Sequence, residues 1–281
     1  MLFRSPARLG RHLLAAGDVR AAAEPLLQGA LRLRIVGDFR AGAALLEALE
    51  ARRADDELDD TRITTWIELA RCLIPVNALD AAQTWVTRAA AAARANQDPH
   101  AESYALRVLG TIVQSRGRYS DAVLILQQAL ALGERSGVLK DVSAALRGIG
   151  TTEVRQGRVE SSLAAWRRAL VYDRILGDEA AIAHCHRGVA VSLRASGDPE
   201  GATAALGVAL AANEKLGDIY TQANCHNELA EMARLRGDLD AAERGYRRAI
   251  ELFERIGAGT VLVRTNLALT QVQRREWRVA L

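Results

Sequence analysis

Glycine recurs along this chain at a fixed interval of twenty residues. Ten glycines share one register, and Asn77 occupies a further position of it; the glycines are Gly17, Gly37, Gly117, Gly137, Gly157, Gly177, Gly197, Gly217, Gly237 and Gly257. Glycine and asparagine most readily adopt the left-handed conformation with which helices end. The register therefore predicts helices of roughly sixteen residues, each ended by a glycine or an asparagine.

Two positions of the register carry other residues. Glu57 and Gln97 break it, and each lies beside a polar cluster, residues 55–60 and 96–99, of the kind that connects helices. The ten glycines, Asn77 and these two positions make thirteen stops. We therefore expect an all-α chain of about fourteen helices and no strand.

Signals for helix starts agree with these stops. Pro99 and Pro199 each follow an aspartate, which places them at the first helical position, where a missing N–H is tolerated. Pro75 is expected to end its helix just before Asn77, and Pro25, inside a helix, is expected to kink or split it. Six aspartates directly follow a glycine of the register, where a carboxylate caps the next helix: Asp18, Asp38, Asp178, Asp198, Asp218 and Asp238.

Composition narrows the class of protein. Aromatic residues make up only 4% of the chain and prolines number five, which favours small helix-forming side chains over β-sheet. The 37 basic residues face 34 acidic ones, a mixed surface without the concentrated positive field of a nucleic-acid binder. Three cysteines without a Cys-x-x-Cys pair favour a reducing, cytoplasmic location. No run of eighteen apolar residues occurs, so no membrane span is expected.

Helices alternate in character along the chain, so the full repeat is forty residues long. Bulky and small positions recur five times in this register, with Glu153 a departure in the third copy. The first two copies are Trp66, Leu69, Ala70, Leu73, Ala82, Val86 and Ala89, and then Leu106, Leu109, Gly110, Val113, Ala122, Leu126 and Ala129. Such alternation lets bulky side chains fill a helical hairpin while small ones allow close approach.

This pattern resembles the tetratricopeptide repeat, W-x2-L-G-x2-Y followed by A-x3-F and a further alanine. The match covers roughly residues 60–257 well and residues 17–53 loosely. The forty-residue period is similar to the long-helix variant found in kinesin light chains and in bacterial signalling regulators. Residues 11–18 resemble the start of the helical arm in bacterial signal-transduction ATPases, including those fused to serine/threonine kinases.

The resemblance implies an α-solenoid of antiparallel helix hairpins with a right-handed superhelical twist. We expect residues 1–281 to form a single domain, with divergent hairpins over 5–56, regular repeats over 58–257 and a capping helix over 258–277. Deleting residues 258–281 is expected to expose Leu229 and Tyr246 and to promote aggregation.

Patterns typical of catalysis are missing from the sequence. It contains no G-x-x-x-x-G-K-[ST], G-x-S-x-G or H-E-x-x-H, so we expect no enzymatic activity and no cofactor. His184-Cys185-His186 and Cys225-His226 suggest zinc ligands, because thiolate and imidazole are its usual donors. Adjacent residues on a helix diverge by about 100°, which argues against shared coordination of a metal. The favoured interpretation is a duplicated repeat position, with a small buried cysteine beside a bulky histidine.

Aromatic residues and paired arginines have two interpretations each. Trp66, Trp166 and Tyr246 occupy bulky repeat positions and are expected in the core, the alternative being an aromatic binding platform. The arginine pairs at 167–168 and 247–248 are expected on a solvated outer face, the alternative being contact with phosphate or membrane.

The resemblance also indicates where a ligand would bind. First helices of the pairs line the concave side, where families of this kind receive peptides or partner helices. The predicted groove residues on these helices are Tyr104, Arg107, Gln114, Arg147, His184, Arg187, Arg194, Asn227 and Arg234. Guanidinium groups bind carboxylate and phosphate, so an acidic or phosphorylated segment is expected there. The alternative is that these arginines only pair with neighbouring acids, and the family's lysine and asparagine carboxylate clamp is not reproduced.

The function expected from the sequence is protein–protein interaction. The chain would be a scaffold or regulatory module of a bacterial-type cytosolic signalling system, binding a peptide or protein in its groove, with kinase or ATPase domains as partners in cis or in trans. The alternative is a regulator arm that contacts nucleic-acid phosphates through the arginines. Phosphate binding weakens linearly with the logarithm of salt concentration, which separates the two hypotheses.

Overall fold

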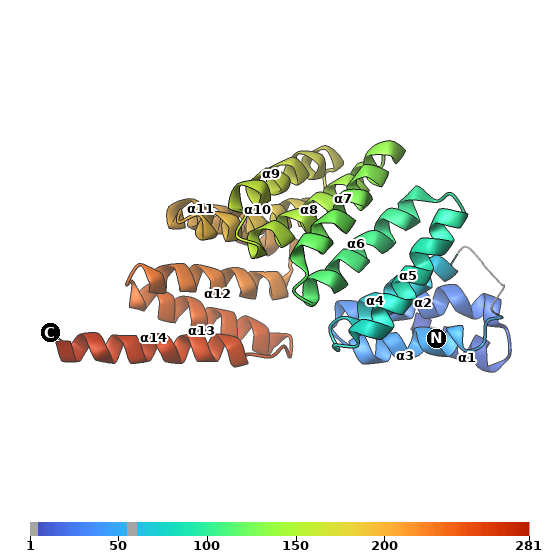
Figure 1. The fold of residues 1–281 in the computed structure, drawn as a ribbon. Helices are drawn as coiled ribbons and strands as arrows, with labels where there is room; N and C mark the ends of the chain where they lie inside the picture. The colour runs from blue at the N-terminus through green and yellow to red at the C-terminus, as the bar shows by residue number, and fades with distance from the viewer. Residues whose placement is uncertain (1–4, 55–60, 281) are drawn as a thin grey trace. The chain divides into compact units, whose positions relative to one another are not determined.

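Helices account for the regular structure of this protein. The computed structural model describes residues 5–54 and 61–280, of which residues 276–280 by backbone only, and these residues form fourteen α-helices and no strand (Figure 1). The predicted all-α class is confirmed. The chain divides into two compact units, Met1–Gly148 and Ile149–Leu281, and the division falls within one helix. A single domain over residues 1–281 stays a prediction.

The helices of each unit follow one another along the chain. The first unit holds α1 (Pro6–Ala15), α2 (Val19–Ile35), α3 (Phe39–Glu50), α4 (Arg62–Leu73), α5 (Leu79–Ala95), α6 (Pro99–Ser115) and α7 (Tyr119–Ser136). The division lies in α8 (Leu139–Arg155), and the second unit continues with α9 (Val159–Leu176), α10 (Glu179–Ala195), α11 (Pro199–Leu216), α12 (Ile219–Leu235), α13 (Leu239–Arg255) and α14 (Val261–Ala280).

Helix ends follow the register of twenty. All ten glycines have a left-handed φ between 65° and 85°, and Asn77 has a φ of 62°, as predicted. Gln97 is neither glycine nor asparagine, yet it adopts a left-handed φ of 54° just after α5, so this position is a helix stop, as the count of thirteen stops predicts. An L-residue other than glycine takes this conformation at a cost of about 1–2 kcal/mol. Glu57 lies outside the described residues.

Helix starts confirm the aspartate caps. The six predicted carboxylates and Asp98 each accept a hydrogen bond from the backbone N–H three residues later, at 2.8–3.2 Å. Pro99 and Pro199 open their helices, and α4 ends at Leu73, ahead of Pro75. Pro25 does not split its helix, since α2 runs through it. The residues that follow it, Leu26 and Leu27, are buried, and this packing holds the helix together.

Small residues receive bulky side chains where helices of a unit pack. In the first unit, a Cβ added to Gly110 would lie 2.8 Å from Leu126. In the second unit, a Cβ on Gly188 would lie 2.2 Å from the ring of Trp166. Trp66, Trp166 and Tyr246 are at most 3% exposed, which confirms their predicted place in the core.

The C-terminal helix covers part of the core of the second unit. Figure 1 shows α12, α13 and α14 side by side. Val263 of α14 belongs to the same buried cluster as Tyr246. The exposure of Tyr246 on deletion of residues 258–281 stays a prediction, which this shared cluster supports. Leu229 packs with Ala202 and Leu206 of α11, and its exposure on deletion of residues 258–281 stays a prediction.

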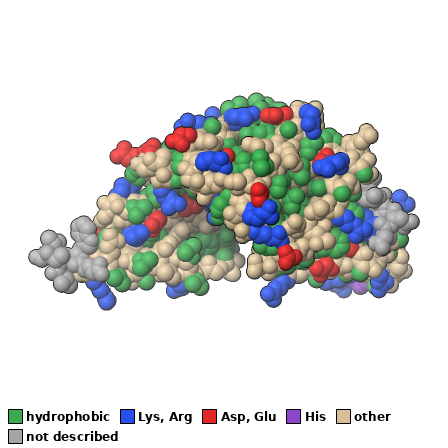
Figure 2. Space-filling view, in the orientation of Figure 1, with side chains coloured by type: hydrophobic (Ala, Val, Ile, Leu, Met, Phe, Trp, Pro, Cys, Tyr) green, Lys and Arg blue, Asp and Glu red, His purple; other side chains and the backbone are tan. Residues whose placement is uncertain are grey.

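The surface carries both signs of charge. Figure 2 shows basic and acidic side chains interspersed on the visible face, with hydrophobic side chains between them. Within the described part of the chain, no helix has the length and the apolar character needed to cross a membrane.

Replacing Gly188 should reveal how closely α9 and α10 pack. Gly188→Ala is expected to lower the free energy of unfolding by about 1–3 kcal/mol, because the new methyl group collides with Trp166. The matched control is Gly207→Ala in α11, where a Cβ meets nothing within 4 Å and helix propensity should raise stability by about 0.5–1 kcal/mol. Urea titration of both variants measures the difference. Equal effects would contradict the packing described for Trp166.

The left-handed glutamine offers a second test. Gln97→Gly is expected to raise the free energy of unfolding by about 0.5–1 kcal/mol, since glycine adopts a φ of 54° without steric cost. The reverse exchange at an equivalent stop, Gly117→Gln, should lower it by about 1 kcal/mol. Thermal and urea unfolding followed by circular dichroism report both changes, and a loss of stability in Gln97→Gly would show that this side chain is needed.

Candidate functional site

The predicted groove residues belong to both units. Tyr104, Arg107 and Gln114 lie on α6, and Arg147 lies on the part of α8 that belongs to the first unit. In the second unit, α10 carries His184, Arg187 and Arg194, while α12 carries Asn227 and Arg234.

In the first unit, Tyr104 and Arg107 are tied into an internal network. The hydroxyl of Tyr104 donates to Glu68 and accepts from Arg71, and burial together with the Glu68 charge raises the pKa of Tyr104 to about 12. The guanidinium of Arg107 lies 4.9 Å from the centre of the Tyr104 ring and 3.4 Å from Asp141. These groups stabilise one another and are not held ready for a ligand.

The other two residues of this set in the first unit are also partly enclosed. Arg147 donates to the hydroxyl of Ser143 at 2.9 Å. The side-chain nitrogen of Gln114 is buried and has no hydrogen-bond partner among the described residues. Burial lowers the pKa of Arg107, and Asp141 opposes this shift.

In the second unit, three predicted groove residues surround one cavity. His184, Arg187 and Arg194 line a cavity of about 500 Å³, here named the basic cavity. Its remaining lining is Thr151, Val154, Arg155, Trp166, Gly188, Val191 and Ala195, so it contains three arginines, one histidine and no carboxylate. Such a lining favours an anionic group.

Local sequence explains the shape of the basic cavity. Gly188 has no side chain, so the indole of Trp166 packs directly against α10. The exposed ring of His184 meets this indole edge-on, with 5.5 Å between ring centres. The indole N–H of Trp166 is buried and has no hydrogen-bond partner among the described residues. The rings of Trp166 and His184 thus form an aromatic part of the cavity lining, beside the charged arginine side chains.

Arg155 is the cavity residue that sequence reasoning missed. It occupies the last position of α8, next to Val154, which lies seven residues after Arg147 on the same helix face. Its position next to Val154 was the signal in the sequence that could have identified Arg155. Within the described chain, the exposed side chains of Arg155 and Arg194 make neither a hydrogen bond nor an ion pair.

Two of the predicted groove arginines in the second unit, Arg187 and Arg234, have acidic partners. Arg187 lies 3.3 Å from Glu228. Arg234 donates two hydrogen bonds to Glu231, at 2.6 and 2.9 Å, and the hydroxyl of Tyr246 donates a third to the same carboxylate. Those bonds lower the pKa of Glu231 and raise that of Arg234.

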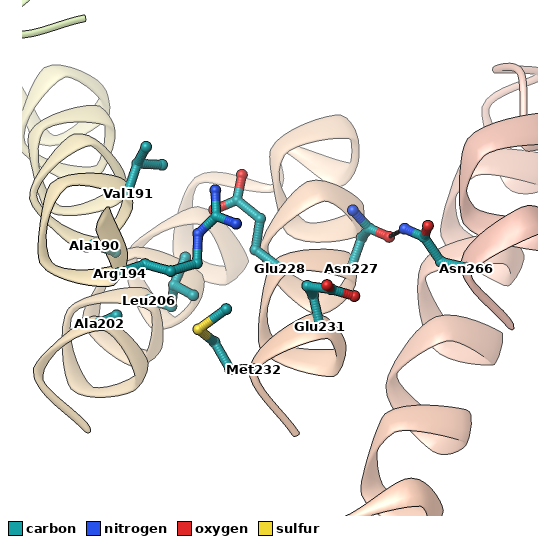
Figure 3. Close-up of a pocket in the computed structure, with 10 residues that line it drawn as sticks. All are labelled: Ala190, Val191, Arg194, Ala202, Leu206, Asn227, Glu228, Glu231, Met232 and Asn266. Atoms are coloured by element: carbon teal, nitrogen blue, oxygen red, sulfur yellow. Dashed lines mark hydrogen bonds between the residues drawn. The ribbon is translucent and has the colours of Figure 1, made fainter. Parts of the chain in front are cut away.

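A second, smaller cavity lies on the other side of Arg194. This cavity of about 140 Å³, here named the acidic cavity, is lined by Arg194, Asn227, Glu228, Glu231 and Asn266 above an apolar floor that includes Leu206 and Met232 (Figure 3). Val191 and Arg194 line both cavities. Asn266 donates a hydrogen bond of 3.3 Å to Asn227. Burial raises the pKa of Glu228, while Arg187 and Arg194 oppose that shift.

The cysteine and histidine pairs occupy equivalent repeat positions. Cys185 and Cys225 are fully buried, as the duplicated-position interpretation predicts. Burial lowers the pKa of both His186 and His226. Over residues 5–54 and 61–275, no three histidine, cysteine or carboxylate side chains are grouped to hold a metal ion.

Comparison with known proteins supports the repeat. Residues 90–136 match the family model of the tetratricopeptide repeat. The predicted resemblance to this repeat is confirmed by that match and by solved structures of the same helical fold. A search of curated protein sequences finds no significant match.

Three solved structures illustrate the fold. A Rap protein complexed with competence and sporulation factor is 14% identical, with a TM-score of 0.67 over 90% of this chain and 76% of its own. The Rap conjugation gene regulator of plasmid pLS20, in complex with the Phr* peptide, is 13% identical, with a TM-score of 0.67 over 93% and 76%. A signal transduction ATPase from Pyrococcus horikoshii with a tetratricopeptide repeat sensor is 14% identical, with a TM-score of 0.64 over 97% of this chain and 44% of its own.

Two arginines of this site should differ in their effect on stability. Arg234→Ala is expected to lower the free energy of unfolding by about 1–2 kcal/mol, because Glu231 loses two charge-assisted bonds. Arg194→Ala, which removes no hydrogen bond, should change it by less than about 0.5 kcal/mol. Urea unfolding compares the two variants. An equal loss in both would make Arg194 a structural residue.

Proposed function

We propose that this chain is a peptide- or protein-binding module whose ligand contacts the inner helices of the second unit. The observation that carries the proposal is the basic cavity, where Arg155 and Arg194 make neither a hydrogen bond nor an ion pair within the described chain and no carboxylate lines the wall. An anionic side chain entering it would find several donors already fixed on helices, so little further ordering would oppose binding. Acidic or phosphorylated segments are the ligands that fit this chemistry.

Solved structures of the same fold support a peptide as the ligand. Two of the similar Rap structures are complexes, one with competence and sporulation factor and one with the Phr* peptide. The similar ATPase carries its tetratricopeptide repeats as a sensor. We accordingly place the chain in a bacterial-type cytosolic signalling system, as a scaffold or regulatory module without catalytic activity of its own, with kinase or ATPase domains as partners in cis or in trans.

The predicted groove residues enter this proposal to different degrees. His184, Arg187, Arg194, Asn227 and Arg234 line or adjoin the two cavities of the second unit, and we propose them as ligand contacts. The residues of the first unit, Tyr104, Arg107, Gln114 and Arg147, stay a prediction.

Peptide binding tests the proposal directly. Acidic and phosphorylated eight-residue peptides should bind more tightly than neutral ones, and Arg155→Ala combined with Arg194→Ala should weaken them by about tenfold or more. Arg167→Ala combined with Arg255→Ala removes the same charge from exposed positions on α9 and α13 and should leave affinity unchanged. Fluorescence anisotropy measures the dissociation constant of each peptide for the wild type and for both double variants.

Salt dependence addresses the alternative of a nucleic-acid arm. Peptide affinity should fall gently with salt, whereas an oligonucleotide bound through several phosphates would lose affinity with a steep log–log slope. Tighter binding of a single-stranded or duplex oligonucleotide than of any peptide would favour the alternative. Unchanged peptide affinity in the double variant at Arg155 and Arg194 would remove the basic cavity as the site.

A further inference from the structure

The two cavities of the second unit have opposite chemistry and share a wall. The basic cavity offers Arg155, His184 and Arg187, while the acidic cavity offers Glu228 and Glu231. Val191 and Arg194, one turn apart on α10, line both. A segment that crosses α10 at these residues therefore meets a cationic compartment on one side and an acidic one on the other.

Glu228 is the acidic group with capacity for a further donor. Glu231 already accepts three hydrogen bonds, from Arg234 twice and from Tyr246. Glu228 accepts one, at 3.3 Å from Arg187, and its other oxygen has no donor within the described part of the chain. Burial disfavours its charge, as its raised pKa shows, so a cation from a ligand would stabilise it.

Arg194 couples the two compartments. Its guanidinium points toward Glu228 in Figure 3 and interacts electrostatically with Glu228 and Glu231, without a hydrogen bond to either. An anion in the basic cavity would attract this guanidinium and weaken its compensation of the two carboxylates. The acidic cavity then becomes more favourable for a cation, so filling one compartment promotes filling the other.

We propose that the second unit recognises an extended segment with an acidic or phosphorylated residue for the basic cavity and, about three residues away, a basic residue for the acidic cavity. The separation follows from the width of the one helix that the segment crosses, about 10–12 Å with its side chains, and from an extended chain advancing about 3.3 Å per residue. This inference rests on the proposed peptide-binding function and specifies the charge pattern of its ligand. The ligand is dipolar, not merely acidic.

An array of eight-residue peptides tests the charge pattern. On an alanine and serine background, one glutamate and one lysine are placed at every separation and in both orders, beside matched peptides with two glutamates, two lysines or two glutamines. Peptides with the opposite charges about three residues apart should bind about tenfold more tightly than the glutamine pair, and more tightly than the glutamate pair. Solution dissociation constants of the best peptides follow from fluorescence anisotropy.

Two single variants assign each charge to its compartment. Arg155→Ala should abolish the gain in peptide affinity that glutamate provides and keep the gain that lysine provides. Glu228→Gln should keep the gain from glutamate and abolish the gain from lysine. Arg194→Ala should keep part of the affinity gained from each charged residue of the peptide, but the two gains should become additive. Arg167→Ala on α9 is the control, and circular dichroism melting confirms that each variant is folded.

The outcomes separate this inference from the function on which it rests. If the glutamate pair binds best and Glu228→Gln has no effect, the dipolar pattern is wrong while peptide binding stands. If charged and uncharged peptides bind with equal affinity, the proposal that the ligand is acidic or phosphorylated is also wrong. If no peptide of the array binds, both the proposed function of this face and the inference fall.

Discussion

Close approach between a small residue on one helix and a bulky side chain on its neighbour is the contact on which the rest of the structure depends. Gly110 receives Leu126 in the first unit, and Gly150 and Gly188 receive Trp166 in the second. A methyl group at any of these glycines would lie under 3 Å from the bulky side chain. The fit recurs along the chain, so helices of both units approach one another through the same kind of contact.

A different kind of contact holds Trp66. Trp66 occupies the first bulky position of its repeat, on α4, and its indole meets the carboxylate of Glu50 at the end of α3. The indole of Trp66 donates to Glu50 at 2.6 Å, and the nearly buried Arg53 and Arg62 compensate the charge. A buried polar network thus replaces apolar contact. Removing one member would leave the others buried without compensation.

The arginines on α6, α8, α10 and α12 divide into two kinds. Arg107, Arg187 and Arg234 pair with carboxylates, as the interpretation of a self-compensated face predicts, whereas Arg194 and Arg155 do not. The distinction matters for function, because a paired guanidinium must lose a partner before it can bind a ligand. An unpaired one beside a cavity is already available. The candidate site is therefore defined less by the number of arginines than by which of them make no hydrogen bond or ion pair to a carboxylate.

The sequence by itself determined the helices, because their ends rest on local conformation: a left-handed residue ends a helix, and at seven helix starts of the described chain a carboxylate caps the next one, neither of which needs a distant partner. It also placed Trp166 and Tyr246 in the core and His184, Arg187 and Arg194 on one helix face. Only the tertiary structure showed that Gln97 itself takes the left-handed conformation, that α2 continues through Pro25, and that Arg155 joins the basic cavity. The pairing of each arginine was likewise decided in three dimensions, since its acid lies on a helix roughly forty residues away or on the next turn, and spacing along the chain does not fix which side chains meet.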